Sequence, residues 1–210
     1  MNLENKILYD ISPLISAKSA VFPGDTPFQQ EFLLKISSGS HLDLSTIKTT
    51  VHIGAHTDAP NHYSATGESI EKRDLSFYLG PAQVIEVNCP RGSRILPQHL
   101  TQDIKATRIL FKTGSFPDVN QWNNDFVALS QELIEFLAAQ KVVLVGIDTP
   151  SVDLADDQLL ESHKTIFRFN MAILEGIVLQ EVESGLYDLI CLPLKIEGAD
   201  ASPVRAILLK

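Results

Sequence analysis

Three of the six histidines in this 210-residue chain lie within eleven residues of one another. His52, His56 and His62 share one segment with Asp58, in the pattern H-x-G-x-H-x-D-x-P-x-H. Imidazole nitrogens and carboxylate oxygens are ligands that zinc and related divalent cations take from proteins. So many polar groups in apolar sequence would be costly to bury unless a metal or a substrate satisfied them. The segment therefore predicts a metal centre, at which a divalent cation would activate water for hydrolysis.

The spacing of these residues constrains the backbone that carries them. On a strand, the four side chains would share one face because all occupy even positions. An extended chain would place His52 and His56 roughly 13 Å apart, which is too far for both to bind one ion through nitrogens at about 2.1 Å. Gly54 supplies the freedom to bend, and Pro60 stops a regular element from continuing. We expect a strand over residues 49–53 that runs into a shaped loop; a helix with the two histidines one turn apart is the weaker alternative.

A second region offers a carboxylate in unusual surroundings. Glu175 lies in an apolar stretch with helical spacing from about residue 169 to 181. A buried carboxylate without a partner would take up a proton, whereas a bound cation would keep it ionised. A pairing with Arg or Lys, or a partly exposed helix position, explains Glu175 equally well. Gly176 beside it would let another backbone approach closely, and His163 carries no signal of its own.

Length and composition bound the class of protein. A chain of 210 residues with 44% hydrophobic and 20% charged residues fits one globular domain over residues 1–210. Its formal charge of -9 argues against a nucleic-acid partner, which would require a basic surface. No apolar run approaches the roughly 20 residues of a membrane helix, and the N-terminus lacks the apolar core of a signal peptide. We expect a cytoplasmic protein without a membrane partner, with Cys89 and Cys191 as buried thiols and His41 and His99 as ordinary histidines.

Hydrophobic patterning predicts a mixed α/β protein. Helical spacing occurs over residues 131–140, which follow a candidate N-cap at Ser130, and again over residues 169–181. Strands near both ends of the chain, with helices in its second half, favour a layered mixed sheet with helices over a regular βαβ repeat, and leave the topology open. The segments that we predict as strands, because they are rich in β-branched residues, are 49–53, 82–87, 108–113, 142–147, 187–193 and 204–209.

Short blocks along nearly the whole chain match the pattern of a known protein family. They are residues 10–14 (DISPL), 22–27 (FPGDTP), 52–62, 146–153 (GIDTPSVD), 173–176 (ILEG) and 192–206, from LPLK to GADASPVRA. On these blocks the chain resembles the cyclase-like metal hydrolases, and most closely the bacterial kynurenine formamidases among them. The histidine segment is typical of the wider family, and the last three blocks favour the formamidase branch.

The resemblance implies a fold, a metal site and a quaternary structure. The fold would be a single α/β domain with a swivelling β/β/α element, assembled as a homodimer. Two metal ions would lie side by side, usually zinc, with manganese as the alternative. His62 would donate and accept the proton of the reaction. The residues that would hold the metals are His52, His56 and Asp58 on one ion, with Asp58 bridging to a second ion held by His163 and Glu175.

Two positions depart from the family pattern. Phe22 stands where this branch commonly has a tryptophan that stacks on the substrate. Phenylalanine keeps an apolar face for a ring but lacks the indole N–H. Ala55 stands where threonine is frequent. Phe22 is therefore the residue that we expect to contact the substrate.

These implications combine into an expected reaction. The metals would lower the pKa of bound water towards neutrality and generate hydroxide as the nucleophile. Hydroxide would attack the formyl group of N-formyl-L-kynurenine, a small-molecule substrate of tryptophan degradation, and His62 would protonate the departing aniline nitrogen. Kynurenine and formate would be the products. The alternatives are hydrolysis of another cyclic amide, ester or lactone, such as isatin, and a metal-binding scaffold without catalysis.

Overall fold

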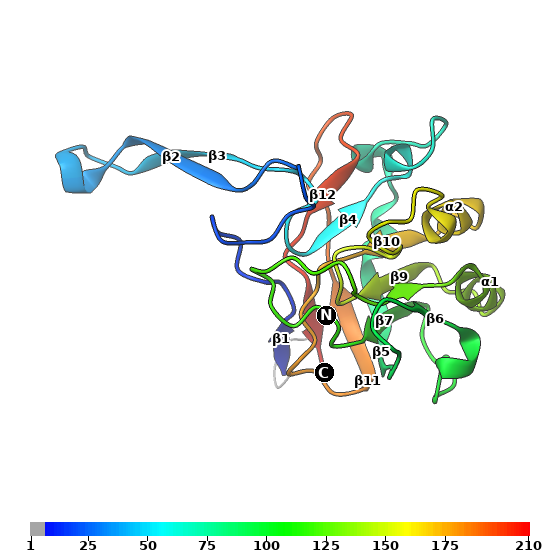
Figure 1. Cartoon of the computed structure of the whole chain (residues 1–210). Helices are drawn as coiled ribbons and strands as arrows, with labels where there is room; N and C mark the ends of the chain where they lie inside the picture. Colours follow the sequence, from blue (N-terminus) through cyan, green and yellow to red (C-terminus); the bar gives the residue numbers. More distant parts are fainter. Residues whose placement is uncertain (1–6) are drawn as a thin grey trace.

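The computed structural model describes residues 7–210, which form a mixed α/β architecture (Figure 1). Its centre is a seven-stranded sheet in the order β1-β13-β11-β5-β7-β9-β10. The four strands from β5 to β10 in this order are parallel, whereas β11 is antiparallel to both of its neighbours and β13 is antiparallel to β1. These strands are β1 (Leu8–Asp10), β5 (Leu79–Glu86), β7 (Arg108–Lys112), β9 (Leu144–Ile147), β10 (Ala172–Leu174), β11 (Gly185–Ile190) and β13 (Ile207–Leu209).

Smaller sheets and helices surround the central sheet. The paired strands are β2 (Gln29–Leu34) with β3 (Leu44–Lys48), β4 (His56–Asp58) with β12 (Ala201–Pro203), and β6 (Arg94–Ile95) with β8 (Ala128–Leu129). The α-helices are α1 (Gln131–Ala139) and α2 (Glu161–Arg168), and the 3-10 helices are Ile36–Ser38, Pro60–His62, Ile70–Lys72, Leu75–Tyr78 and Pro97–His99. Within residues 7–210, no helix has the length and apolar character needed to span a membrane.

Both faces of the central sheet are buried. Along β5, Val84 packs in one apolar cluster and Ile85 in a second, because consecutive strand residues point to opposite faces. The second cluster also contains Leu133 of α1 and Ile166 of α2, so the two helices cover that face. Two-sided burial explains why these strands are nearly continuous apolar runs in the sequence.

The predicted fold class, a layered mixed sheet with helices, is confirmed, and so are most strands of the central sheet. The predictions at 82–87, 108–113 and 142–147 correspond to β5, β7 and β9. Those at 187–193 and 204–209 overlap β11 and β13, but both strands have different bounds from the predicted ones.

The first predicted helix is also confirmed. It corresponds to α1, and Ser130 Oγ accepts the N–H of Leu133 at 3.0 Å, as an N-cap does. Both cysteines are free thiols; Cys191 is buried as expected, whereas Cys89 is only half-buried.

Two predicted elements are wrong. The helix predicted over residues 169–181 is replaced by the short strand β10, which pairs with β9. The sequence of a short apolar run that is buried on both faces does not distinguish a strand from a helix. Here the run forms a strand because it pairs with β9 at the edge of the central sheet. The helix in this part of the chain is the earlier and more polar α2. The strand predicted over residues 49–53 is absent as well, because these residues form bends and β4 begins only at His56.

Two glycines mark a close approach of distant segments. Gly54 and Gly176 both have positive φ, at 61° and 64°. A Cβ atom at Gly176 would lie 2.2 Å from the carbonyl oxygen of Gly54. The contact joins the histidine segment to the residues after β10, and it leaves no room for a side chain.

We expect Gly176→Ala to destabilise the protein by well over about 1 kcal/mol, because left-handed strain and a backbone collision add together. Gly198→Ala is the matched control, since Gly198 has a similar φ of 73° but open space around its Cα. Denaturant unfolding of both variants measures the difference. Equal losses of stability in the two variants would mean that the close approach contributes nothing.

Candidate metal centre

Strand β4 places two of the predicted ligands. His56 and Asp58 are two residues apart on this strand and therefore point to the same side. On one edge β4 pairs with β12. On the other edge, the amide and carbonyl of His56 exchange hydrogen bonds with those of Glu175, at 3.1 and 2.9 Å. This bridge brings Glu175 beside two residues that precede it by more than 100 positions.

The predicted bend between the first two histidines is confirmed, although it precedes the strand rather than following it. It is centred on Gly54, whose φ is positive. The bend brings the His52 and His56 rings to 5.2 Å between centroids. Pro60 then opens a 3-10 helix that turns the chain back, so that the His62 ring lies 4.3 Å from the His52 ring.

All five predicted ligands face one another. Their short contacts are His52 Nδ1 to Asp58 Oδ1 at 3.1 Å, His56 Nε2 to Asp58 Oδ1 at 3.5 Å and to Glu175 Oε2 at 3.1 Å, and His163 Nε2 to Asp58 Oδ2 at 3.3 Å and to Glu175 Oε1 at 3.8 Å. The ligand atoms of His52, His56 and Asp58 lie within 4.8 Å of one another. A second such group combines Asp58 and His163 with His62. From the sequence alone, only the group of His52, His56 and Asp58 was predicted to form a metal site.

The outer nitrogen of each ligand histidine is held by an oxygen acceptor. His56 Nδ1 donates to the carbonyl of Gly54 at 3.0 Å, and His163 Nδ1 donates to the Asp153 carboxylate at 2.8 Å. His52 Nε2 lies 3.1 Å from Asp200 Oδ2. Since these acceptors take the N–H of the outer nitrogen, a neutral imidazole would present the lone pair of its inner nitrogen to the centre, as in metal sites.

Asp153 and Asp200 contact the predicted ligand histidines, and the sequence assigned a role to neither. Asp153 is fully buried; it accepts the backbone N–H groups of Ser162 and His163 and forms an ion pair with Arg94 at 2.7 Å. Asp200 lies at the edge of the site, and Oδ2 is 3.3 Å from His62 Nδ1 as well as contacting His52. Both lie in blocks that carry the family resemblance, but their contacts with the ligand histidines join distant parts of the chain and become visible only in the structure.

The carboxylates shift the pKa values of the histidines. Burial by itself would lower the pKa of His52, but the adjacent Asp58 and Asp200 outweigh it and raise this pKa to about 9. Burial likewise opposes protonation of His163, and Asp153 and Asp58 raise its pKa to about 10. In return, the histidines hold the pKa of Asp58 well below its usual value against the effect of burial. The centre therefore attracts positive charge strongly, and a metal would have to displace protons from it.

One buried atom tests whether a cation fits. Asp58 Oδ1 is buried and accepts no hydrogen bond within the described structure, although His52 Nδ1 and His56 Nε2 both face it. A carboxylate oxygen left in this way would be costly. A divalent cation between these three atoms would satisfy it with two imidazole nitrogens and a carboxylate, a donor set that suits zinc. The residues present therefore fit a metal.

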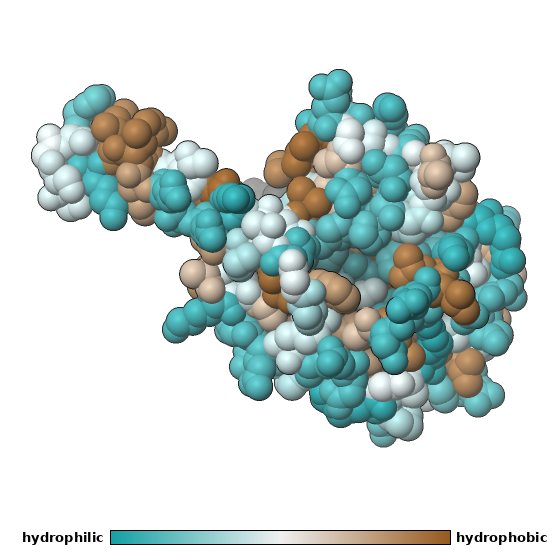
Figure 2. All heavy atoms as spheres, turned by 45° about the horizontal axis from the view of Figure 1, so that its top comes forward, coloured by the Kyte–Doolittle hydropathy of each residue, from teal (hydrophilic) through white to brown (hydrophobic). Residues whose placement is uncertain are grey.

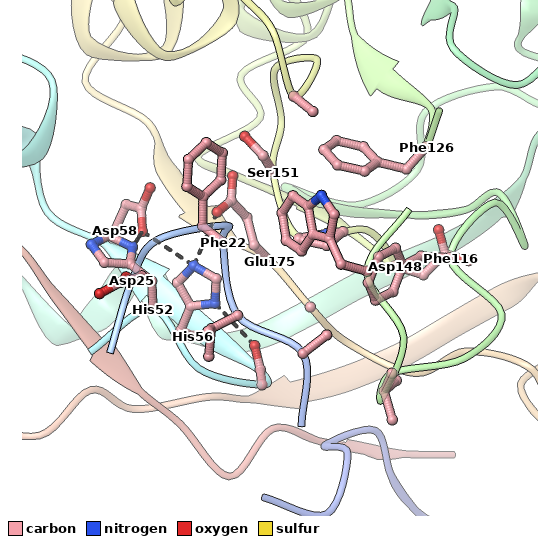
Figure 3. Close-up of a pocket in the computed structure, with 18 of the residues that line it drawn as sticks. Phe22, Asp25, His52, His56, Asp58, Phe116, Phe126, Asp148, Ser151 and Glu175 are labelled. Carbon is pink, nitrogen blue, oxygen red and sulfur yellow. Dashed lines mark hydrogen bonds and ion pairs between the residues drawn. The ribbon is translucent and has the colours of Figure 1, made fainter. Parts of the chain in front are cut away.

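The centre forms one end of a cavity of about 340 Å³ (Figure 3). Phe22, Phe116, Trp122 and Phe126 also line it, so the cavity combines a polar end with aromatic surface. The Trp122 ring meets Phe22 edge to face at 5.5 Å. Phe22 thus lines the cavity as a substrate-binding residue would, and Trp122 is an aromatic partner that the sequence did not reveal.

Asp148 also lines the cavity, but its carboxylate forms hydrogen bonds with the turn after β7 and not with the predicted ligands. Its carboxylate accepts the backbone N–H groups of Thr113 and Gly114. Burial raises its pKa in spite of these hydrogen bonds. These bonds give Asp148 the role of holding the turn after β7.

Comparisons with known proteins identify the family of this chain. The family described as putative cyclase matches residues 9–154. Curated relatives named kynurenine formamidase, from Bordetella petrii and Bordetella pertussis, are 46% and 44% identical to the chain over 97% of its length and 98% of theirs.

Solved structures share the whole fold. A potential metal-dependent hydrolase with cyclase activity superimposes with a TM-score of 0.83 at 26% identity, over 97% of this chain and 98% of that one. An isatin hydrolase bound to a product analogue superimposes with a TM-score of 0.80 at 19% identity, over 98% and 92% of the two chains, and shows the fold alone. This chain belongs to the putative cyclase family of hydrolases, in the group of the kynurenine formamidases.

Proposed function

We propose that this protein is a metal-dependent amidohydrolase that cleaves N-formyl-L-kynurenine to L-kynurenine and formate. The observation that carries the proposal is one cavity with metal-binding side chains at one end and aromatic rings along its wall. The substrate has the same two parts, an amide carbonyl and a flat aryl ring. The relatives named kynurenine formamidase support this choice of amide.

The two oxygens of Asp58 point to two neighbouring cation positions. Oδ1 faces His52 and His56, which would complete the first position. Oδ2 faces His163, which together with Glu175 would complete the second. We propose zinc at both positions, because imidazole and carboxylate donors suit it, with manganese as the alternative. When bound, such cations act as Lewis acids that polarise the amide carbonyl and lower the pKa of water.

His62 is placed to move the proton. Its side chain is one-third exposed, at 34%, and a ring nitrogen lies within 4.8 Å of ligand atoms of both Asp58 and His163. Asp200 next to Nδ1 favours the N–H on that nitrogen and leaves Nε2 to exchange a proton with the reactants. Water attacks the formyl carbon and gives its proton to His62. His62 then protonates the aniline nitrogen as the C–N bond breaks.

The aromatic residues would bind the aryl ring. Phe22 and Trp122 offer two large faces at an angle of 79°, so a flat ring can lie against one and meet the edge of the other. Trp122 Nε1 donates to Asn124 at 2.6 Å, which fixes the indole and occupies its N–H. Phe22 and Trp122 would therefore select an aryl ring by its shape. The bond that is cleaved would be selected at the polar end of the cavity.

We expect chelation to abolish hydrolysis of N-formyl-L-kynurenine and added zinc to restore it, because the ligands alone cannot polarise the carbonyl. Kynurenine absorbance measures the rate, and metal analysis of the active protein gives the number of ions. Isatin, assayed in parallel, should be a poorer substrate. Full activity after complete removal of metal would refute the mechanism, and faster turnover of isatin would refute the substrate.

We expect His62→Ala to lower kcat by about 10²- to 10⁴-fold with little change in bound zinc, because the proton transfer is lost while the ligands remain. His99→Gln, at a histidine outside the cavity, is the control and should keep its activity. If the His62 variant turned over at the normal rate, another group would have to move the proton.

We expect Asp153→Asn to weaken zinc binding by about 10- to 100-fold, because the amide cannot accept from both His163 Nδ1 and the backbone donors that now meet the carboxylate. Asp157→Asn is the matched control. Asp157 pairs with the same Arg94 but has no contact with His163 among those that the structure records. Competition with a chromophoric chelator measures both affinities. Equal affinities in the two variants would show that Asp153 does not position His163.

A further inference from the structure

Arg94 on β6 is not among the residues that line the cavity of the candidate metal centre. Its guanidinium nevertheless contacts the segment that leads into α2. Nη1 lies 2.7 Å from Asp153 Oδ1, 3.0 Å from Ser162 Oγ and 2.6 Å from the carbonyl oxygen of Leu129 on β8. Nη2 donates to the carboxylate of Asp157. One planar group therefore connects β6 and β8 to the start of α2.

The start of α2 depends on contacts from outside the helix. Leu160, the residue before it, makes no side-chain cap hydrogen bond and has a φ of 52°, which leucine rarely adopts. Of the four buried residues of α2, only Ile166 is apolar. Figure 2 shows a mainly hydrophilic surface at the right of the view, where the two helices lie. Local sequence and apolar packing therefore do not by themselves determine where α2 begins.

Asp153 supplies the missing cap. Its carboxylate accepts the backbone N–H groups of Ser162 at 3.0 Å and His163 at 3.1 Å. These are the second and third residues of α2, whose N–H groups a side chain at the N-cap position normally accepts. The same carboxylate accepts Nδ1–H of His163 at 2.8 Å. Asp153 thus holds both the backbone and the ring of one predicted ligand.

The position of Asp153 depends in turn on Arg94. Asp153 is fully buried, so water cannot compensate its charge and a cation has to do so. Within residues 7–210, Arg94 is the only lysine or arginine for which an ion pair with Asp153 is recorded. Without the guanidinium, the carboxylate would turn towards other donors, and the hydrogen-bonded ring of His163 would turn with it.

We propose that Arg94 is the positioning residue for the second cation position. It acts through Asp153, which orients His163 towards Asp58. The inference rests on the proposed function, in which His163 and Glu175 hold the second cation. A guanidinium suits this task better than an ammonium, because its rigid fork fixes a direction as well as a charge.

The first cation position is held by other groups. The carbonyl of Gly54 accepts from His56, and Asp200 contacts His52. None of the hydrogen bonds recorded for the Arg94 side chain within the described chain reaches these four residues. Loss of Arg94 should therefore weaken one of two bound zinc ions and spare the other.

The test is the zinc affinity of full-length Arg94→Ala, measured by competition with a chromophoric chelator. The wild-type protein should release two ions with two dissociation constants. In the variant, one constant should rise about 10- to 100-fold, as it does when a ligand histidine loses its outer partner, and the other should stay near its wild-type value. Arg91→Ala is the matched control and should keep both constants, because Arg91 pairs with the exposed Asp125.

Chemical rescue separates positioning from a general loss of stability. Arg94 lines a second cavity of about 550 Å³, so its replacement by alanine would leave a gap that opens into this cavity. Millimolar methylguanidinium should fill the gap and restore the affinity for the second zinc ion. Methylammonium, which has the charge without the fork, should not. Neither cation should change the zinc affinity of wild type or of Arg91→Ala.

Arg94→Lys is the second variant, because it keeps a cation and most of the side-chain packing and should fold even if the alanine variant does not. Its single nitrogen cannot replace both arms of the fork at Asp153 and Asp157. The affinity for the second zinc ion should therefore still fall at least about 10-fold, with a normal circular dichroism spectrum.

The outcomes distinguish this inference from the proposed function. If wild type binds two zinc ions and the Arg94 variants bind both as tightly, the inference alone is wrong. Equal weakening of both ions without rescue, or equal rescue by methylammonium, would also overturn the positioning role. A wild-type protein that binds a single zinc ion would refute the second cation position itself, and the inference with it.

Discussion

The structure of the site depends on one buried carboxylate. Both oxygens of Asp58 face imidazole nitrogens, and one of them accepts no hydrogen bond from the described residues. Water cannot compensate this charge at 2% exposure, so the compensation must come from protons or from cations. Oxygen acceptors on Gly54, Asp153 and Asp200 hold the imidazole N–H groups outward. That orientation suits cations, because lone pairs point inward once the histidines have lost their inner protons.

This requirement explains the irregular backbone around the site. The ligands come from the bend after β3, from β4, from the end of β10 and from α2, and no single element can carry them. Positive φ at Gly54 and Gly176 allows two of these segments to touch through their backbones. A metal that links the segments would add its binding free energy to the stability of the fold. Metal binding and folding would therefore be coupled where these segments meet.

The sequence predicted the parts of the site that are local. The histidine segment, residues 52–62, contains the ligand residue types, their spacing and a glycine at the bend, and all of these can be recognised from eleven consecutive residues. His163 came only from the family resemblance, and for Glu175 the sequence left a metal and an ordinary role equally open, because the contacts of these residues with Asp58 and His56 span more than 100 residues. Glu175 was assigned to a helix, yet the argument from its burial in apolar sequence still singled it out. The strand β10 was missed because a three-residue strand buried on both faces has no periodicity of its own.

The aromatic wall shows how a departure from the family pattern can be compensated from elsewhere. Phe22 supplies a smaller ring than the tryptophan common at its position, and Trp122 reaches it from a loop 100 residues away. Phe116 and Phe126 pack edge to face on Trp122, at 6.0 and 5.9 Å, and fix its plane. Because Asn124 already accepts the indole N–H, this wall offers a substrate shape and apolar area rather than a hydrogen bond. Under the proposed function, discrimination between amides would then arise at the opposite end of the cavity, where His62 and the predicted ligand residues lie.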